Sequence, residues 1–306
     1  MRKIIVTSGW RYTEIDLLAC AIAYAELLNS ENKNATVVLP GEFNKSITKD
    51  IQKWSLKLKK NTDNSNVKFV IVDVSNPKYF AKFVEENKII EIYDHHTGFE
   101  QYWKDKLGKN SKIEMIGACA TLIWEEFEKR NKSKISKTSA NLLYTAIISN
   151  TLNLNAQITN KRDINAFNKI KKLTSLPNNW TEKYFIDQDK SVYKNPIKET
   201  KNDTHTEKVP QIRGDIIIGQ LELWNSKDFI KKHTPKIERA LKSFGKPVWF
   251  MTSPSISEGI NYIFTKNEEI KKLLSKTIRA KFKGNLGTTD KLWLRKEILK
   301  KLNETE

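Results

Sequence analysis

The 306-residue chain has few cysteines, few histidines and no long apolar run. Its two cysteines, Cys20 and Cys119, lie in separate apolar segments, which predicts buried free thiols rather than a disulfide or a metal pair. The longest apolar stretch, residues 17–28, is too short to cross a bilayer and contains Glu26. Because the first residues run straight into a strand pattern without signal-peptide features, we expect a cytoplasmic protein with no membrane partner.

Acidic residues are also in the minority, with 36 Asp and Glu against 54 Lys and Arg and a net charge of +18. Nearly all of the positive residues are lysines, and they are spread along the chain. Nucleic-acid-binding proteins usually interleave arginine and aromatic residues along a groove, so nucleic acid is not an expected partner. The excess charge is interpreted either as a solvated basic surface or as a field that attracts a phosphate-containing small-molecule substrate, and the two are compatible.

The first half of the chain alternates between short β-branched runs and helical periodicity. This pattern indicates βαβ units and an α/β fold with a doubly wound parallel sheet. The expected strands are residues 3–8, 35–40, 68–74, 88–96 and 112–117, and the expected helices are 16–29, 48–59, 77–87, 118–130, 137–149 and 162–173.

A polar stretch at about 187–211 interrupts the periodicity, and a smaller α/β pattern follows it. We therefore expect domains at 1–188 and 212–306, joined by a linker or mobile loop at 189–211. Hairpin-like neighbours in the second pattern favour a mixed sheet. Its expected strands are 214–224, 246–253 and 259–265, and its expected helices are 226–243 and 267 to about 277.

Polar side chains follow three of the predicted strands in the first domain. Glu14 and Asp16 come after the first strand, Asp73 ends the third, and "DHH" at 94–96 ends the fourth. The carboxyl ends of parallel strands meet at one edge of a sheet, where ligands bind. An aspartate after a strand is often a helix cap and a histidine pair is often structural. The convergence of several segments instead favours a divalent metal site of the Mn, Mg or Fe type.

These residues carry a resemblance to the DHH phosphoesterase superfamily. "VIVDV" at 70–74 followed by "YDHHT" at 93–97 resembles its signature, and "IDLLACAIAYAELL", "IGACATLIWEEF" and "LLYTAIISNTLNL" resemble further motifs in the same order. "IIIGQLEL" and "LRKEILKKL" resemble the second-type DHH-associated C-terminal domain, as in family II manganese-dependent inorganic pyrophosphatases, exopolyphosphatases and prune-like proteins. The resemblance spans most of the chain.

The resemblance implies a role for each matching position. Asp73 would bridge two metal ions, Asp16 and His95 would bind the second metal, and Asp94 would orient the metal-bound histidine. His96, Arg295 and Lys296 would bind substrate phosphate, and Asp73, His96 and Lys296 would take part in catalysis. The active site would lie in a cleft between the domains, the polar stretch would be a hinge, and a homodimer is possible.

Three positions depart from the family pattern. An aspartate of the first metal site falls on Glu14, a carboxylate of the second falls on Asn150, and a metal-binding histidine falls on Trp10 or, with a longer loop, on Ser8. Glu14 and the side-chain carbonyl of Asn150 are candidate metal ligands, whereas tryptophan has no lone pair to offer a metal ion. We therefore expect one well-formed site and one weak site for Mn²⁺, or for Mg²⁺ or Co²⁺.

The resemblance implies a metal-dependent hydrolase that cleaves a phosphoanhydride or phosphoester bond with metal-activated water, similar to inorganic pyrophosphatase. A related phosphoesterase acting on a nucleotide or a short polyphosphate is a second hypothesis. A catalytically degenerate protein that binds phosphate ligands or partners without efficient hydrolysis is a third, favoured by Trp10 and Asn150.

Overall fold

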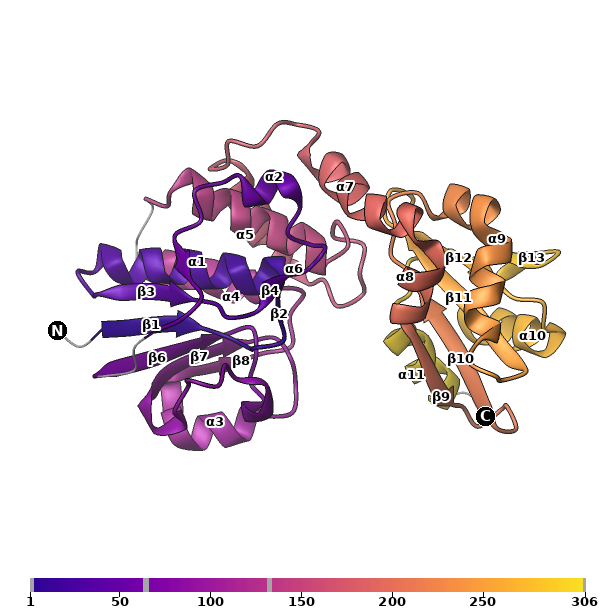
Figure 1. The fold of residues 1–306 in the computed structure, drawn as a ribbon, viewed down its shortest axis with the longest axis horizontal. Coiled ribbons are helices and arrows are strands. Elements are labelled where there is room, and N and C mark those ends of the chain that lie inside the picture. Colours follow the sequence, from indigo (N-terminus) through magenta and orange to yellow (C-terminus); the bar gives the residue numbers. More distant parts are fainter. Residues whose placement is uncertain (1–2, 63–65, 131–133, 305–306) are drawn as a thin grey trace. The chain divides into compact units, whose positions relative to one another are not determined.

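The computed structural model describes residues 3–62, 66–130 and 134–304, which pack as two units (Figure 1). The first unit comprises Met1–Leu154 and Ile158–Thr181, and the second comprises Asn155–Gln157 and Glu182–Glu306. Helix α7 (Trp180–Lys194) begins in the first unit and continues into the second. None of the described helices is long and apolar enough to cross a membrane.

The first unit contains a six-stranded sheet in which every neighbouring pair is parallel, so the predicted fold class is confirmed. In spatial order the strands are β5 (Leu58–Lys59), β3 (Ala35–Val38), β1 (Lys3–Thr7), β6 (Val67–Val72), β7 (Ile89–Asp94) and β8 (Ser111–Ile113). Two short strands, β2 (Tyr12–Thr13) and β4 (Glu42–Phe43), form a separate parallel pair.

Helices cover both faces of this sheet, which explains why its strands are apolar runs. Helices α1 and α5 lie on one face and α3 lies on the other (Figure 1). The fully buried Trp103 of α3 joins Phe69 and Ile92 in the core on its face. The helices of the first unit are α1 (Ile15–Ser30), α2 (Lys49–Gln52), α3 (Glu100–Leu107), α4 (Cys119–Lys129), α5 (Lys137–Asn150) and α6 (Lys161–Lys171).

Two predicted helices of the first unit are wrong. Residues 48–59 form only the short α2 before strand β5. Residues 77–87 form a 3₁₀ turn at Pro77–Tyr79, a single bridge at Phe80 and the start of a second 3₁₀ turn at Glu86–Lys88. Phe80 pairs with Gly9 after strand β1, and the Ala81 N–H donates to the Ser8 carbonyl. Pairing with a distant segment therefore overrides the local helical pattern.

The second unit contains a mixed six-stranded sheet, as predicted. Only β10 and β11 pair in parallel, and the other four pairs are antiparallel. In spatial order the strands are β13 (Lys281–Lys283), β14 (Leu286–Thr288), β12 (Ile260–Phe264), β11 (Val248–Ser255), β10 (Asp215–Gln220) and β9 (Thr204–Lys208).

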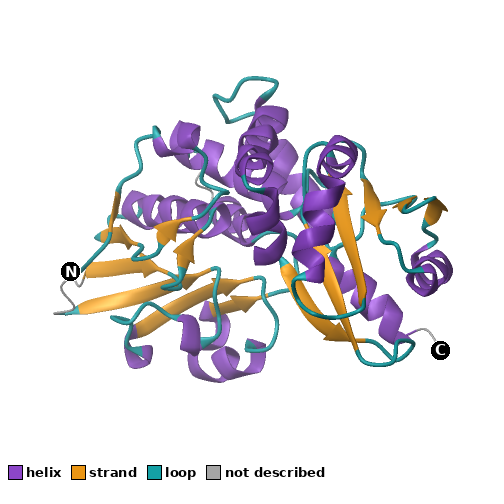
Figure 2. Ribbon diagram, turned by 45° about the vertical axis from the view of Figure 1, so that its right-hand side comes forward, coloured by secondary structure: helices purple, strands orange, loops and turns teal. Residues whose placement is uncertain are grey.

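Successive side chains of β10 point to opposite faces of the sheet and pack into two separate cores. Figure 2 shows the helices that lie around this sheet. Ile217 packs with residues of α9, whereas Ile216 and Ile218 pack with residues of α10 and α11. The remaining helices are α8 (Pro196–Asn202), α9 (Ser226–Lys242), α10 (Glu268–Ile278) and α11 (Arg295–Glu304).

The expected linker at 189–211 is instead regular structure for most of its length. It contains the end of α7, all of α8 and the edge strand β9, which pairs antiparallel with β10. Strand β9 reads "THTEK", and the polar residues that suggested a loop are those of an exposed sheet edge. Glycine at position 219 of β10 lets β9 pack close to it, because a Cβ at that position would lie 3.1 Å from Thr204 Oγ1.

Candidate metal centre

The carboxyl ends of three adjacent strands bring the predicted polar residues together. Strands β1, β6 and β7 are neighbours and parallel, so Ser8, Asp73 and the segment Asp94–His96 emerge at the same edge. Asp16 lies in the first turn of α1, which follows β1 and the short strand β2. The sheet topology therefore produces the convergence that the sequence predicted.

Asp73 is buried, with a left-handed backbone and a carboxylate that accepts no hydrogen bond from the described residues. Its backbone has φ of +58°, a left-handed conformation that aspartate tolerates better than most residues, and its N–H donates to the Tyr93 carbonyl. Neither carboxylate oxygen accepts a hydrogen bond from a described donor group, although His95 Nε2 lies 3.5 Å from Oδ1 and the Glu14 carboxyl is a side-chain neighbour. Burial, followed by the charge of Asp16, raises the pKa of Asp73 well above its usual value. A buried carboxylate without a partner is costly, which points to a cation as its missing partner.

The His95 ring is held in the orientation that a metal ligand needs. Its Nδ1 lies 3.1 Å from the Ile116 carbonyl, which fixes Nδ1 as the donor and leaves a lone pair on Nε2. That Nε2 faces two carboxylates, 3.5 Å from Asp73 Oδ1 and 4.0 Å from Asp16 Oδ2. The backbone carbonyl of Ile116 thus supplies the support that a metal-bound histidine requires.

Asp94 holds His96 rather than the ring of His95. Its Oδ1 accepts from His96 Nδ1 at 2.8 Å, as well as from the backbone N–H groups of His95 and His96. The ring of His95 bonds to the Ile116 carbonyl and not to Asp94, and the role of Asp94 as an orienter stays a prediction. The hydrogen bond with Asp94 raises the pKa of His96, which favours the charged imidazolium.

Asp16 ties helix α1 to the start of helix α4. Its Oδ2 accepts from the Cys119 N–H and its Oδ1 from the Ala120 N–H, both at 2.8 Å. The Cys20 thiol also donates to Oδ1 at 3.4 Å. Both cysteines are buried free thiols, as predicted. Asp16 is therefore a structural carboxylate that also faces His95.

A group of three side chains has the spacing of a metal site. One ligand atom each from Asp73, His95 and His96 lie within 4.8 Å of one another. The Asp73 carboxylate and the His95 imidazole suit Mn²⁺ and similar cations, and the oxygens of Asp73 supply the negative charge. The residues present therefore fit a divalent cation.

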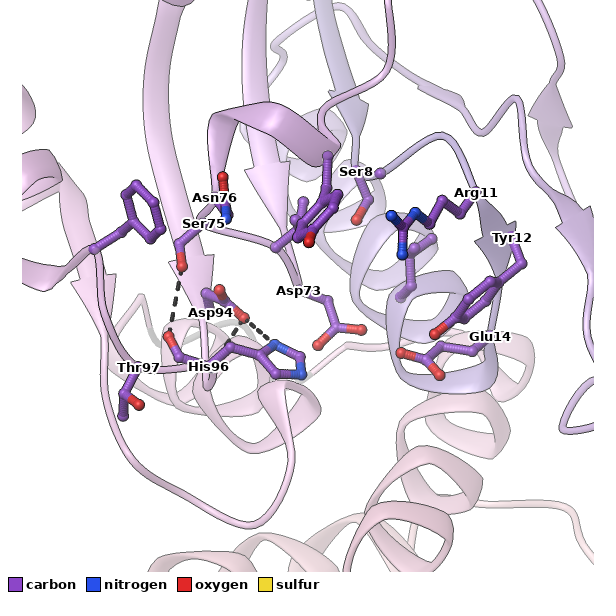
Figure 3. Close-up of a pocket in the computed structure, with 15 residues that line it drawn as sticks. Ser8, Arg11, Tyr12, Glu14, Asp73, Ser75, Asn76, Asp94, His96 and Thr97 are labelled. Carbon is purple, nitrogen blue, oxygen red and sulfur yellow. Dashed lines mark hydrogen bonds and ion pairs between the residues drawn. The ribbon is translucent and has the colours of Figure 1, made fainter. Parts of the chain in front are cut away.

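A cavity of about 370 Å³ opens beside this group (Figure 3). Figure 3 shows the Asp73 carboxylate between His96 and Glu14. The side-chain hydroxyl of Ser8 is buried there without a partner among the described residues. The lining residues are Ser8, Gly9, Arg11, Tyr12, Glu14, Leu17, Asp73, Val74, Ser75, Asn76, Tyr79, Asp94, His96, Thr97 and Phe99.

The three departures from the family pattern occupy different environments. Glu14 lines the cavity, and burial followed by the charge of Asp16 raises its pKa. Trp10 is 44% exposed and does not line the cavity, whereas Ser8 does. Asn150 ends α5, donates to the Ala146 carbonyl of its own helix at 3.3 Å, and is absent from the lining. The structure thus brings Glu14 to the centre but not Trp10 or Asn150.

Arg295 and Lys296 begin helix α11 in the second unit. The Arg295 guanidinium donates to both the carbonyl and the carboxylate of Asp203 at 2.8 Å, and it lies 3.1 Å from His205 Nε2. Lys296 is exposed. Binding of phosphate by Arg295 would therefore require it to share or exchange these contacts.

Sequence reasoning missed several cavity residues. Arg11 and Tyr12 follow strand β1, and Ser75 and Asn76 follow strand β6, so their positions after strands were the available signal. Tyr79 ends a 3₁₀ turn next to Phe80, which pairs with Gly9, and no sequence signal indicated that pairing.

Gly117, in the glycine-led motif, permits a close contact that supports the centre. Its N–H donates to Asp163 Oδ2 at 3.0 Å, and a Cβ at this position would lie 2.7 Å from that oxygen. The same carboxylate accepts from Thr121 Oγ1 at 2.7 Å and completes the capping box of α6 with Asn160. Gly117 therefore fixes the segment whose Ile116 carbonyl orients His95.

Bound Mn²⁺ is expected to stabilise the folded protein more strongly as pH rises. The pKa values of Glu14, Asp16 and Asp73 are all raised, with burial as the largest cause. Their protonated forms therefore stabilise the fold below the unfolded pKa of about 4, and this contribution is lost as pH rises through the raised folded values.

Thermal unfolding of EDTA-treated and Mn²⁺-loaded protein across pH 4 to 8 measures this effect. The difference in Tm should widen with pH. Carboxyls with lowered pKa, such as Glu31 and Glu125, are present in both samples and cancel in the difference. A difference that stays constant with pH would contradict the prediction.

No family model matches the chain. It is 26% identical over 171 residues to a probable manganese-dependent inorganic pyrophosphatase of Lactobacillus delbrueckii subsp. bulgaricus, covering 55% of this chain and 54% of that protein. It is 27% identical over 179 residues to the manganese-dependent inorganic pyrophosphatase of Bacillus subtilis, covering 58% and 57%. The matches thus span about half the length of these relatives.

Solved structures extend the likeness in fold to nearly the whole chain. A putative family II inorganic pyrophosphatase of Methanococcus jannaschii superposes with a TM-score of 0.60 at 20% identity, covering 99% of both chains. An exopolyphosphatase-related protein of Bacteroides fragilis gives a TM-score of 0.52 at 13% identity, covering 99% of this chain and 91% of that one. The predicted resemblance is confirmed: the chain is related in sequence to manganese-dependent inorganic pyrophosphatases and shares the fold of family II.

Proposed function

We propose that the protein is a divalent-metal-dependent hydrolase that cleaves a phosphoanhydride or phosphoester bond. The observation that carries the proposal is the partnerless, buried carboxylate of Asp73 grouped with His95 and His96. Relatives named manganese-dependent inorganic pyrophosphatases support the same class of reaction. A bound divalent cation would supply Lewis-acid chemistry, which neutralises phosphate oxygens and lowers the pKa of water.

The side chains of the chain have separate roles in this proposal. Asp73 and the Nε2 of His95 would hold the cation, and Asp16 would contribute negative charge beside His95. His96, whose Nδ1 lies 2.8 Å from Asp94 Oδ1, would donate a hydrogen bond to a phosphate oxygen from Nε2. Glu14 and Ser8 line the same cavity and are candidates for a second, weaker cation site.

Phosphate release by the full chain tests the proposal. The purified protein would be loaded with Mn²⁺, Mg²⁺ or Co²⁺ and given pyrophosphate, tripolyphosphate and nucleotides. Metal content would be measured on the same samples. Release that requires metal supports the proposal. Metal and phosphate binding without release from any substrate would replace it with a binding role, which Asn150 and the Asp203-bound Arg295 would then help to explain.

A further inference from the structure

Three exposed aromatic residues lie at or next to the cavity lining in the chain. Trp10, Tyr12 and Tyr79 are 44%, 51% and 40% exposed, and we call these three residues the aromatic rim. Tyr12 and Tyr79 line the cavity, and the backbone N–H of Trp10 donates to the backbone carbonyl of Tyr79 at 3.1 Å. The other exposed large apolar side chains among the described residues are Tyr102, Met115, Ile164 and Ile186. Aromatic surface gathered beside a cavity indicates a ligand with an apolar part.

Arg11 joins the aromatic rim to the cavity. Its guanidinium carbon lies 4.6 Å from the ring centroid of Tyr79 and 5.9 Å from that of Trp10. No ion pair to Arg11 occurs in the described part of the chain, and the residue is exposed and lines the cavity. In Figure 3 its guanidinium points toward the space above Asp73 and Glu14. A planar cation stacked on rings therefore stands between the aromatic surface and the candidate metal centre.

Pyrophosphate does not match this combination. It presents only anionic oxygens, which the cation, His96 and Arg11 would contact, so the rings of the aromatic rim would have no partner. A nucleoside phosphate matches all of it, because its phosphates suit the charged end of the cavity and its base has a π-face that stacks on exposed rings. The volume of about 370 Å³ is in the range of cavities that hold small organic ligands.

We infer that the preferred substrate is a nucleoside polyphosphate whose base stacks on Trp10 and Tyr79. This inference rests on the proposed function and names its substrate class. In the reaction, the oxygen of water forms a bond to the terminal phosphorus and the bridging P–O bond breaks. The leaving oxygen keeps the electron pair and takes up a proton, giving orthophosphate and a nucleotide shorter by one phosphate.

The test compares ATP with tripolyphosphate, which has the same phosphate chain without a nucleoside. With Mn²⁺-loaded full-length protein, kcat/KM should be at least about 10-fold higher for ATP, since stacking of a base contributes roughly 1–3 kcal/mol. Trp10→Ala and Tyr79→Ala should each reduce this preference at least about 5-fold. Trp10→Phe and Tyr79→Phe are matched controls that keep a ring and should retain the preference. Equal kcat/KM for the two substrates in the wild type would overturn the inference.

Two further measurements separate this inference from the proposed function. Pyrophosphate hydrolysis without any preference for ATP would refute the inference and leave the hydrolase proposal standing. Rim-dependent binding of the β,γ-methylene analogue of ATP, without phosphate release from any substrate, would support the nucleotide class and refute hydrolysis. Size-exclusion chromatography addresses a second copy of the chain as occupant: a dimer lost in Trp10→Ala, with the preference unchanged, would assign the rings to an interface.

Discussion

Replacing Asp73 by asparagine is expected to abolish metal binding and phosphate release while making the metal-free protein more stable. The substitution removes the one buried carboxylate of the centre whose oxygens accept no hydrogen bond among the described residues. It also relieves repulsion from Asp16 and Glu14, which contribute to the raised pKa of Asp73. Asparagine tolerates the left-handed backbone of this position better than alanine would.

The expected magnitudes are large for activity and moderate for stability. Loss of the cation should cost several kcal/mol of transition-state stabilisation, or at least about 100-fold in kcat/KM. Removal of the unpaired charge should raise the unfolding free energy of the metal-free protein by about 1–2 kcal/mol. Metal titration, phosphate release and denaturant unfolding with EDTA measure the three effects. Asp290→Asn, at an exposed aspartate, is the control. A destabilised metal-free Asp73→Asn variant would contradict this account of the residue.

Asp16→Asn is expected to have the opposite effect on the metal-free protein. Both oxygens of Asp16 accept backbone N–H groups at the start of α4. An asparagine can offer one oxygen, so its amide nitrogen would face the second N–H and leave that buried donor without an acceptor. We expect a loss of about 2–3 kcal/mol in unfolding free energy, because an unsatisfied buried group costs about 1–3 kcal/mol and two donors would also repel.

Denaturant unfolding of the two variants side by side checks this contrast. The metal-free Asp73→Asn protein should unfold at higher urea than the wild type, and Asp16→Asn at lower urea, with an unchanged slope. Equal shifts in the same direction would show that the hydrogen bonds to Cys119 and Ala120 do not distinguish the two carboxylates.

The sequence predicted the parts of the centre that depend on strand order. Asp73, Asp94, His95 and His96 directly follow or end apolar strands, so a parallel sheet had to bring them to one edge. It could not predict that Ile116 rather than Asp94 orients His95, because that contact joins residues 21 positions apart through a loop. Nor could it predict the stacking of Arg11 on Tyr79, since that contact depends on the pairing of Phe80 with Gly9.

The same limit applies to the second unit. Helices α9 and α10 and strands β10 to β12 were predicted from apolar periodicity, which reports on buried faces. Strand β9 was not predicted because an edge strand buries few side chains, and most of its residues are polar and face solvent. Periodicity therefore located the central strands of this sheet and missed an edge strand that is ordered mainly by backbone pairing.

The hydrogen bonds from Cys119 and Ala120 to Asp16 set the order in which the molecule can assemble. They join residues 103 and 104 positions apart, and the His95 support at Ile116 lies within the same late segment. Contacts of such long sequence separation form only after intervening loops have closed. A chain emerging from the ribosome could therefore complete this centre only once strands β1, β6 and β7 and the start of α4 had been made.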